Sequence, residues 1–157
     1  MAVRRFSVPA VIPAPPRDVY AVLADYREGH PRILPRPPFE SLDVEAGGIG
    51  AGTVIRVGMR VLGRRQSFRA VVSEPEPGRV LVERNDDGTV TTFTVEPVAN
   101  GRSARVTIAT ELAGGRGIRG VVEQWLTPRL LRPVYVKELG LLAAVAAERG
   151  RARGEGA

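Results

Sequence analysis

The 157-residue sequence predicts one α+β domain, in which a curved antiparallel β-sheet wraps around a long C-terminal α-helix. Two observations predict this fold. Between residues 39 and 112, β-branched runs are interrupted by turn residues about every ten positions, which is typical of an antiparallel meander. After residue 115, apolar residues recur at spacings of one, three and four, which draws one stripe along a helix. A sheet that is apolar on one face needs a cover, and this helix is the only predicted element large enough to provide it.

Two short helical segments are expected between the first strand and the meander. Residues 3–12 alternate imperfectly between apolar and polar side chains and predict a strand, with Pro9 at an edge or a bulge. Pro15 and Pro16 suit a first helical turn, so a helix is expected from there to about Asp25. A second short helical turn or loop follows over residues 26–35.

The meander is expected to contain six strands. Asp87-Gly88 and Asn100-Gly101 are the strongest hairpin signals, because both residues of a type I′ turn need positive φ. Gly63-Arg64 and Pro75-Glu76-Pro77 predict two more turns. The expected strands cover residues 39–46, 53–62, 66–74, 79–85, 90–98 and 103–112.

Counting outward from each turn predicts which side chains share the inner face of the sheet, because a slip of one residue would flip a whole strand. The last hairpin places Phe93 opposite Ile108. The hairpin at Gly63-Arg64 places Met59 opposite Phe68. With these registers, the apolar rows of all the strands fall on one side of a single sheet.

Arg84 is predicted to be the inward-facing charge at one end of this apolar face. A two-residue turn at Asp87-Gly88 places it opposite Thr91, with Thr110 beyond. A guanidinium in a dry interior must reach water, a carboxylate or a ligand. Two interpretations are therefore open: Arg84 extends to solvent along its stem, or it anchors a carboxylate or carbonyl of a ligand.

The C-terminal helix contains Pro128 and Pro133, so a kink or a restart is expected near Thr127. Residues 149–157 contain no apolar side chain larger than alanine and predict a disordered basic tail. The expected domain organisation is a single domain over residues 1–148 followed by this tail.

Composition excludes several classes of function. The absence of cysteine excludes disulfides and thiolate chemistry, and one histidine leaves no zinc or other transition-metal constellation, so no metal or cofactor is expected. The net charge of +6 comes from arginines scattered along the chain, with few aromatic residues, so nucleic acid is an unlikely partner. No apolar stretch approaches the roughly 20 residues of a membrane span, and a cytoplasmic location is expected.

Several short motifs resemble those of the START-like (SRPBCC) superfamily, also labelled polyketide cyclase/dehydrase, whose fold is the helix-grip. The segment Ile12-Pro13-Ala14-Pro15 leads into apolar positions and then Asp25, which is similar to the opening of that superfamily. The glycine-rich turn before Gly52-Thr53, the Glu74-Pro75 turn and the Glu138-Leu139 run are similar too. The resemblance covers residues 3–148 and implies a hydrophobic cavity between the sheet and the C-terminal helix.

Three functions remain open on this basis. The resemblance implies binding of a small hydrophobic molecule such as a lipid or a polyketide, since relatives bind lipids, sterols, polyketides or plant hormones. The alternative is a polyketide cyclase or dehydratase acting in the same cavity. A module that buries an apolar group of a partner protein is a third possibility. The ligand and the oligomeric state are not predicted.

His30 is the only histidine and hence the only side chain with an ordinary pKa near neutrality. Two interpretations are open: a general acid, if its loop folds over the cavity mouth, or an exposed loop residue before proline. Aromatic residues on the inner face are either core packing or ligand contacts. The candidate ligand-binding residues are Tyr26, His30, Met59, Phe68, Arg84, Phe93, Thr110, Trp125 and Tyr135.

Overall fold

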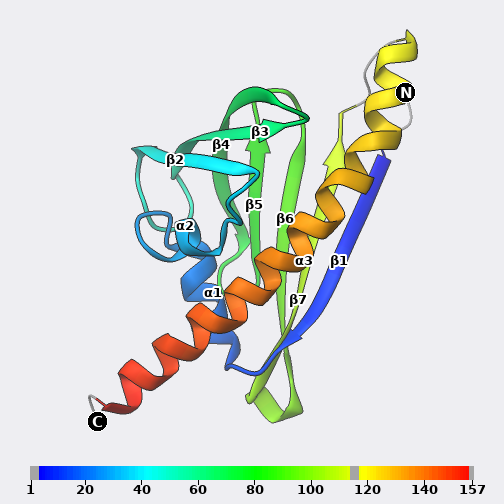
Figure 1. Cartoon of the computed structure of the whole chain (residues 1–157). Helices are drawn as coiled ribbons and strands as arrows, with labels where there is room; N and C mark the ends of the chain where they lie inside the picture. The colour runs from blue at the N-terminus through cyan, green and yellow to red at the C-terminus, as the bar shows by residue number, and fades with distance from the viewer. Residues whose placement is uncertain (1–3, 114–116, 156–157) are drawn as a thin grey trace.

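The computed structural model describes residues 4–113 and 117–155, and the side chains among them except those of 117–125 and 155. The chain has the predicted order of one strand, two short helices, a meander and a long helix (Figure 1). The elements are β1 (Arg4–Ile12), α1 (Pro16–Ala24), α2 (Gly29–Ile33), β2 (Phe39–Ala46), β3 (Val54–Val61), β4 (Arg64–Glu76), β5 (Val80–Asn85), β6 (Val90–Val98), the 3₁₀ turn η1 (Ala99–Gly101), β7 (Ser103–Leu112) and α3 (Gly117–Glu155).

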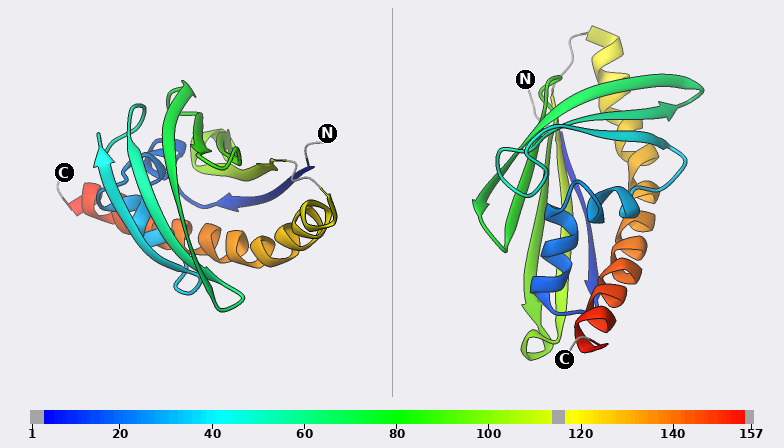
Figure 2. Two further views of the ribbon diagram at one scale, coloured as in Figure 1. Left: turned by 90° about the horizontal axis from the view of Figure 1, so that it is seen from above. Right: turned by 90° about the vertical axis from the view of Figure 1, so that its left-hand side faces the viewer.

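All seven strands form one antiparallel sheet in the order β1-β7-β6-β5-β4-β3-β2. The meander β2 to β7 is sequential, and β1 returns to pair with β7 at the opposite edge from β2. The sheet curves, and α3 lies along its concave side with α1 and α2 beside it (Figure 2). The predicted α+β helix-grip fold is therefore confirmed.

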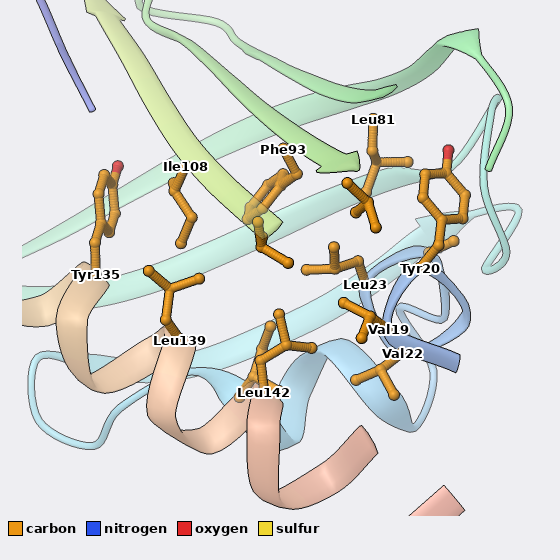
Figure 3. Close-up of a cluster of buried hydrophobic side chains, with 14 of the residues drawn as sticks. Val19, Tyr20, Val22, Leu23, Leu81, Phe93, Ile108, Tyr135, Leu139 and Leu142 are labelled. Carbon is orange, nitrogen blue, oxygen red and sulfur yellow. The ribbon is translucent and has the colours of Figure 1, made fainter. Parts of the chain in front are cut away.

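The core lies where α1, α3 and the concave face meet. Val19 and Leu23 of α1 are fully buried, as are Leu81 and Val95 of the sheet, and Leu142 of α3 is 1% exposed. Figure 3 shows side chains from the two helices pointing toward those of the strands. Burying each such side chain stabilises the fold by roughly 1.5–3 kcal/mol, which is the main reason the helices stay on the sheet.

In two of the predicted hairpins, the residues expected on the inner face of the sheet do lie there. The β6–β7 register is confirmed, since Phe93 pairs with Ile108. The β3–β4 turn is wrong by an even shift, so that Val57 and not Met59 pairs with Phe68. The turn residues are Leu62 and Gly63, both with positive φ (51° and 77°). An even shift leaves the same residues on the inner face.

The β5–β6 register is wrong by an odd shift, and this reverses the predicted orientation of Arg84. Glu83, not Arg84, pairs with Thr91. The cause is a longer turn: Asn85 N–H donates to the Thr89 carbonyl at 2.9 Å. Because side chains alternate along a strand, Arg84 is exposed on the outer side, whereas the Glu83 side chain is only 12% exposed.

Helix α3 is continuous through Pro128 and Pro133, so the expected restart near Thr127 is wrong. Its ribbon curves gradually along its length (Figure 2). Each proline removes a single backbone donor, and the rest of the helical hydrogen bonds remain available. Near Pro133 the helix packs against β1, since Arg132 Nη1 donates to the Ser7 carbonyl at 3.2 Å and Phe6 stacks on Tyr135.

The expected disordered tail is wrong for residues 149–155, which continue α3. Asp18 of α1 is 2% exposed, and it pairs with Arg153 and with Arg149, whose Nε lies 3.9 Å from Asp18 Oδ1. A buried carboxylate requires such cations, and these ion pairs tie the end of α3 to α1. Residues 156 and 157 lie outside the described part of the chain.

No described helix combines the length and apolar character needed to span a bilayer. Within the described ranges, no group of three or more His, Cys, Asp or Glu side chains is arranged to hold a metal ion.

Candidate functional site

A pocket of about 500 Å³ lies between the concave face of the sheet and helices α2 and α3. Its wall is mostly apolar because the inward rows of the strands and the stripe of α3 meet there. Two groups of polar side chains interrupt this wall, one around Glu83 and one around Tyr135. The other polar lining residues are Arg60, Gln66, Asn85, Asp87, Thr89 and Thr127. The apolar lining residues are Leu34, Pro37, Pro38, Phe39, Leu42, Ile55, Val57, Met59, Val61, Leu62, Phe68, Phe93, Leu112, Leu130, Leu131 and Val134.

His30 lines the pocket from α2 and is only 2% exposed, so the interpretation as an exposed loop residue is wrong. Its ring stacks on Tyr26 with centroids 4.5 Å apart and meets the Phe93 ring edge-on at 5.5 Å. His30 Nδ1 lies 2.7 Å from the Leu23 carbonyl oxygen. A carbonyl can only accept, so Nδ1 carries a proton, and Nε2 faces Glu83 Oε1 at 3.6 Å.

Glu83 is the inward-facing charge of β5. Tyr26 donates a 2.6 Å hydrogen bond from its hydroxyl to Glu83 Oε1. Burial and the neighbouring Glu83 charge raise the pKa of Tyr26, so its hydroxyl stays protonated and remains a donor. Tyr26, Glu83 and His30 thus form one connected polar cluster beneath an apolar cavity.

Glu138 of α3 is a second buried carboxyl beside this cluster, and it lines the pocket with 3% exposure. Burial, and then repulsion from Glu83, raise the pKa of Glu138 well above its ordinary value. These effects favour the neutral acid over the carboxylate. The two glutamates therefore differ: Tyr26 donates to Glu83, whereas no described residue donates to the Glu138 carboxyl, whose oxygens are accessible from the pocket.

A chain of hydroxyls forms the second of the two polar groups in the wall. The Thr91 and Thr110 Oγ1 atoms lie 3.1 Å apart, and Thr110 Oγ1 lies 2.7 Å from the Tyr135 hydroxyl. Phe6 stacks on the Tyr135 ring at 5.6 Å. Burial raises the pKa of Tyr135, which keeps its hydroxyl protonated and able to hydrogen-bond a ligand.

Most of the sequence-predicted candidates lie at the pocket. Tyr26 is fully buried behind His30 and reaches the pocket only through Glu83. Arg84 points away from the pocket, so its predicted role at the cavity is wrong, and the side chain of Trp125 lies outside the described residues. Six candidates line the pocket: His30, Met59, Phe68, Phe93, Thr110 and Tyr135.

Sequence reasoning missed Glu83 and Glu138 as site residues. Glu138 carried a signal, since it interrupts an otherwise apolar stripe on the last helix. Glu83 carried none that could be read without the true length of the β5–β6 turn.

A curved sheet that holds a long helix against its concave face, with a pocket between the two, defines a START-like helix-grip domain. Residues 3–147 match the family described as polyketide cyclase / dehydrase and lipid transport, and the chain belongs to this family. No curated protein sequence matches the chain.

Solved structures share the fold over nearly the whole chain. The KanY protein, solved by NMR in solution, is 26% identical with a TM-score of 0.80, covering 94% of this chain and 99% of its own. The Zhui aromatase/cyclase from Streptomyces sp. R1128 is 19% identical with a TM-score of 0.78, covering 98% and 99%. Norcoclaurine synthase from Thalictrum flavum is 15% identical with a TM-score of 0.69, covering 94% and 88%. The likeness to the last two shows the fold alone.

Proposed function

We propose that the protein binds a small hydrophobic molecule, of the size and character of a lipid or polyketide, in the pocket between the sheet and α3. The observation that carries this proposal is a volume of about 500 Å³ with a mostly apolar wall. Pockets of this size and character are typical of small-molecule sites, because burial of apolar surface supplies affinity while a few polar groups orient the ligand. The family's description is consistent with such a ligand.

Two substitutions on one helix test the proposal. Val134 lines the pocket, whereas Val136 of the same helix is 57% exposed. Val134→Trp places an indole in the pocket, and Val136→Trp places the same group in solvent. The neutral dye N-phenyl-1-naphthylamine should bind the wild type and Val136→Trp equally, with enhanced fluorescence.

Val134→Trp should weaken dye binding by about tenfold or more, since the lost apolar contact area is worth upward of 1.4 kcal/mol. Circular dichroism and a melting curve check that this variant folds. Equal dye binding by both tryptophan variants, or none by the folded wild type, would refute a ligand pocket. If the dye results support a pocket, native mass spectrometry of protein purified without detergent would identify any ligand that co-purifies.

A second candidate function is polyketide cyclisation or dehydration, and the geometry of His30 favours it. The Leu23 carbonyl accepts from Nδ1 of this buried imidazole, which leaves Nε2 without a hydrogen bond, 3.6 Å from Glu83 Oε1. Nε2 could take a proton from the carbon beside a substrate carbonyl, giving an enolate whose carbon attacks a second carbonyl. This attack leaves an alkoxide on the second carbonyl carbon. The imidazolium, stabilised by Glu83, returns the proton to that alkoxide, which becomes an alcohol. In a dehydration, the enolate electrons form a carbon–carbon double bond while the imidazolium protonates the hydroxyl on the β-carbon, which departs as water.

Proton exchange of a simple ketone tests this chemistry without the natural substrate. The α-protons of 2-tetralone exchange in D₂O, and NMR follows the rate. The wild type should accelerate exchange above an equal concentration of free imidazole, and His30→Gln should remove the acceleration while the side-chain amide still donates to Leu23. Bound 2-tetralone that exchanges at the background rate would indicate binding without catalysis.

A further inference from the structure

The inner part of the pocket is acidic. The lining residues with ionisable acid or base groups, besides Tyr135, are His30, Arg60, Glu83, Asp87 and Glu138. Arg60 and Asp87 are exposed and sit at the rim, and Arg60 Nε lies 3.8 Å from Glu40. Among the described lining residues, the interior therefore holds two glutamates and a histidine and no arginine or lysine. A ligand carboxylate or phosphate that entered this part would face repulsion from Glu83.

Glu138 is the group at this end that lacks a protein partner. Tyr26 donates to Glu83, His30 donates from Nδ1 to Leu23, and Tyr135 is bonded to Thr110. Glu138 is 3% exposed as a residue and lines the pocket, and no described residue donates a hydrogen bond to its carboxyl. Among the described residues, no fully buried side-chain nitrogen or oxygen lacks a hydrogen-bond partner, so the Glu138 oxygens are accessible from the pocket. A carboxyl that is open to an otherwise largely apolar pocket and that no protein donor occupies is available to a donor group of the ligand.

We infer that the ligand carries a basic nitrogen on its hydrophobic body, and that its ammonium group binds between Glu83 and Glu138. This inference rests on the proposed binding function. An ammonium has only donors, which matches two carboxyl groups, and hydrogen bonds between charged partners are about twice as strong as neutral ones. A neutral alcohol offers one donor and gains less. A carboxylate offers none.

Binding of an ammonium should be linked to proton release. The neutral form of Glu138, favoured in the empty pocket, loses its proton when the cation arrives, because the cation then offsets the charge of the carboxylate. The titratable groups that face this site are Glu83 on β5, Tyr26 after α1, His30 on α2 and Tyr135 on α3. Both tyrosines stay protonated, and Glu138 is the carboxyl at this site whose pKa is raised, so the proton is expected to come from Glu138.

Three ligands with one ring system test the inference by calorimetry: 1-naphthylmethylamine, 1-naphthalenemethanol and 1-naphthoate. The amine should bind the wild type about tenfold more tightly than the alcohol, the ratio expected from one charge-assisted hydrogen bond, and the acid should bind weakest. Titrations in buffers of different ionisation enthalpy should show about one proton released per amine bound and none for the alcohol.

Glu138→Gln keeps the side-chain shape and removes the charge. It should lower the ratio of amine to alcohol affinity, with Glu83 remaining as the one carboxylate partner, and abolish the proton release. Glu148→Gln is the matched control, because Glu148 lies exposed near the end of the same helix, and it should keep the wild-type ratio and proton release.

An alcohol that binds as tightly as the amine, or an unchanged ratio in Glu138→Gln, overturns the inference. Loss of proton release only on substitution of His30 also overturns it, since Glu138 would then not be the responding group. If the neutral dye binds but the amine does not, the inference falls and the proposed function stands. If neither binds, both fall.

Discussion

The Tyr26 hydroxyl lies 2.6 Å from Glu83 Oε1 and donates to it, joining the segment after α1 to strand β5 beneath the pocket. The two residues are far apart in the sequence, and both are largely withdrawn from water. This hydrogen bond holds Glu83 beside His30 and determines which of its oxygens is already occupied. It therefore couples the stability of the fold to the arrangement of the site.

Removing this hydroxyl should destabilise the protein more than removing a similar one elsewhere. Tyr20 also donates at 2.6 Å, to Glu74, whose other oxygen accepts the Ala51 N–H at 2.7 Å. Tyr26→Phe should lower the free energy of unfolding by about 1–3 kcal/mol, because it leaves a buried carboxylate without its donor. Tyr20→Phe should cost less, since Glu74 keeps a partner. Urea denaturation of both variants measures the two losses of unfolding free energy. Equal losses would contradict the view that Glu83 depends on the Tyr26 hydroxyl more than Glu74 depends on that of Tyr20.

Glu138 should make the protein less stable as pH rises. The pKa of Glu138 is raised in the folded state, so above about pH 4.3, the ordinary glutamate value, the unfolded chain releases this proton while the folded chain keeps it. Stability attributable to Glu138 therefore falls with increasing pH, by at most about 1.4 kcal/mol per pH unit, until the folded group ionises.

Glu138→Gln removes this dependence and should be increasingly more stable than the wild type from pH 4 toward pH 8. Urea unfolding at several pH values measures the difference between the two curves, which isolates Glu138 from other titrating groups. A difference that does not change with pH would show that Glu138 ionises normally.

The end of α3 should contribute to stability through Asp18. Replacing both Arg149 and Arg153 by glutamine should lower the free energy of unfolding by roughly 1–2 kcal/mol, because Asp18 would stay buried without a cation. The arginine side chains are about half exposed, so the loss is smaller than for a fully buried pair.

Arg151 provides the control, since it is exposed between the two paired arginines. Arg151→Gln should change stability by less than about 0.5 kcal/mol. Thermal unfolding compares the variants. Truncation after Glu148 should reproduce the loss seen in the double variant, and a truncated protein as stable as the wild type would show that the ion pairs contribute nothing.

The β3–β4 turn should be stabilised by a residue that tolerates positive φ. Leu62 has φ 51° and is 71% exposed, so its side chain gains little from packing while its backbone is unfavourable. Leu62→Asn creates an Asn-Gly type I′ turn and should raise the free energy of unfolding by about 1 kcal/mol. Leu62→Val, β-branched at the same position, should lower it. The reverse order in denaturant unfolding would contradict this account of the turn.

Much of the fold could be predicted because it depends on local patterns. The alternation of residues 103–112 and the helical stripe of α3 are properties of the segments themselves, and the Asn100-Gly101 turn sets the Phe93–Ile108 pairing from within one hairpin. Even the misplaced β3–β4 turn kept its inner face, because an even shift preserves the alternation.

The site depends on distances between segments, which local patterns do not contain. One additional residue in the β5–β6 turn moved Glu83 to the inner face and Arg84 to the outer one. The burial of His30 depends on how α2 packs against Tyr26 and Phe93, and the helical end of α3 depends on Asp18 of α1.

The sequence by itself determined the fold class, the order of the elements and the apolar character of the space between sheet and helix, because periodicity and turn chemistry act over a few residues. Only the tertiary structure decided which polar groups enter that space. Glu83, Glu138 and His30 come from three elements, β5, α3 and α2, which the curved sheet and the helices packed on it bring together. Burial and the nearby Glu83 charge raise the pKa of Glu138, whose carboxyl lines the pocket. This proximity depends on the packing of several segments and cannot be predicted from any one of them.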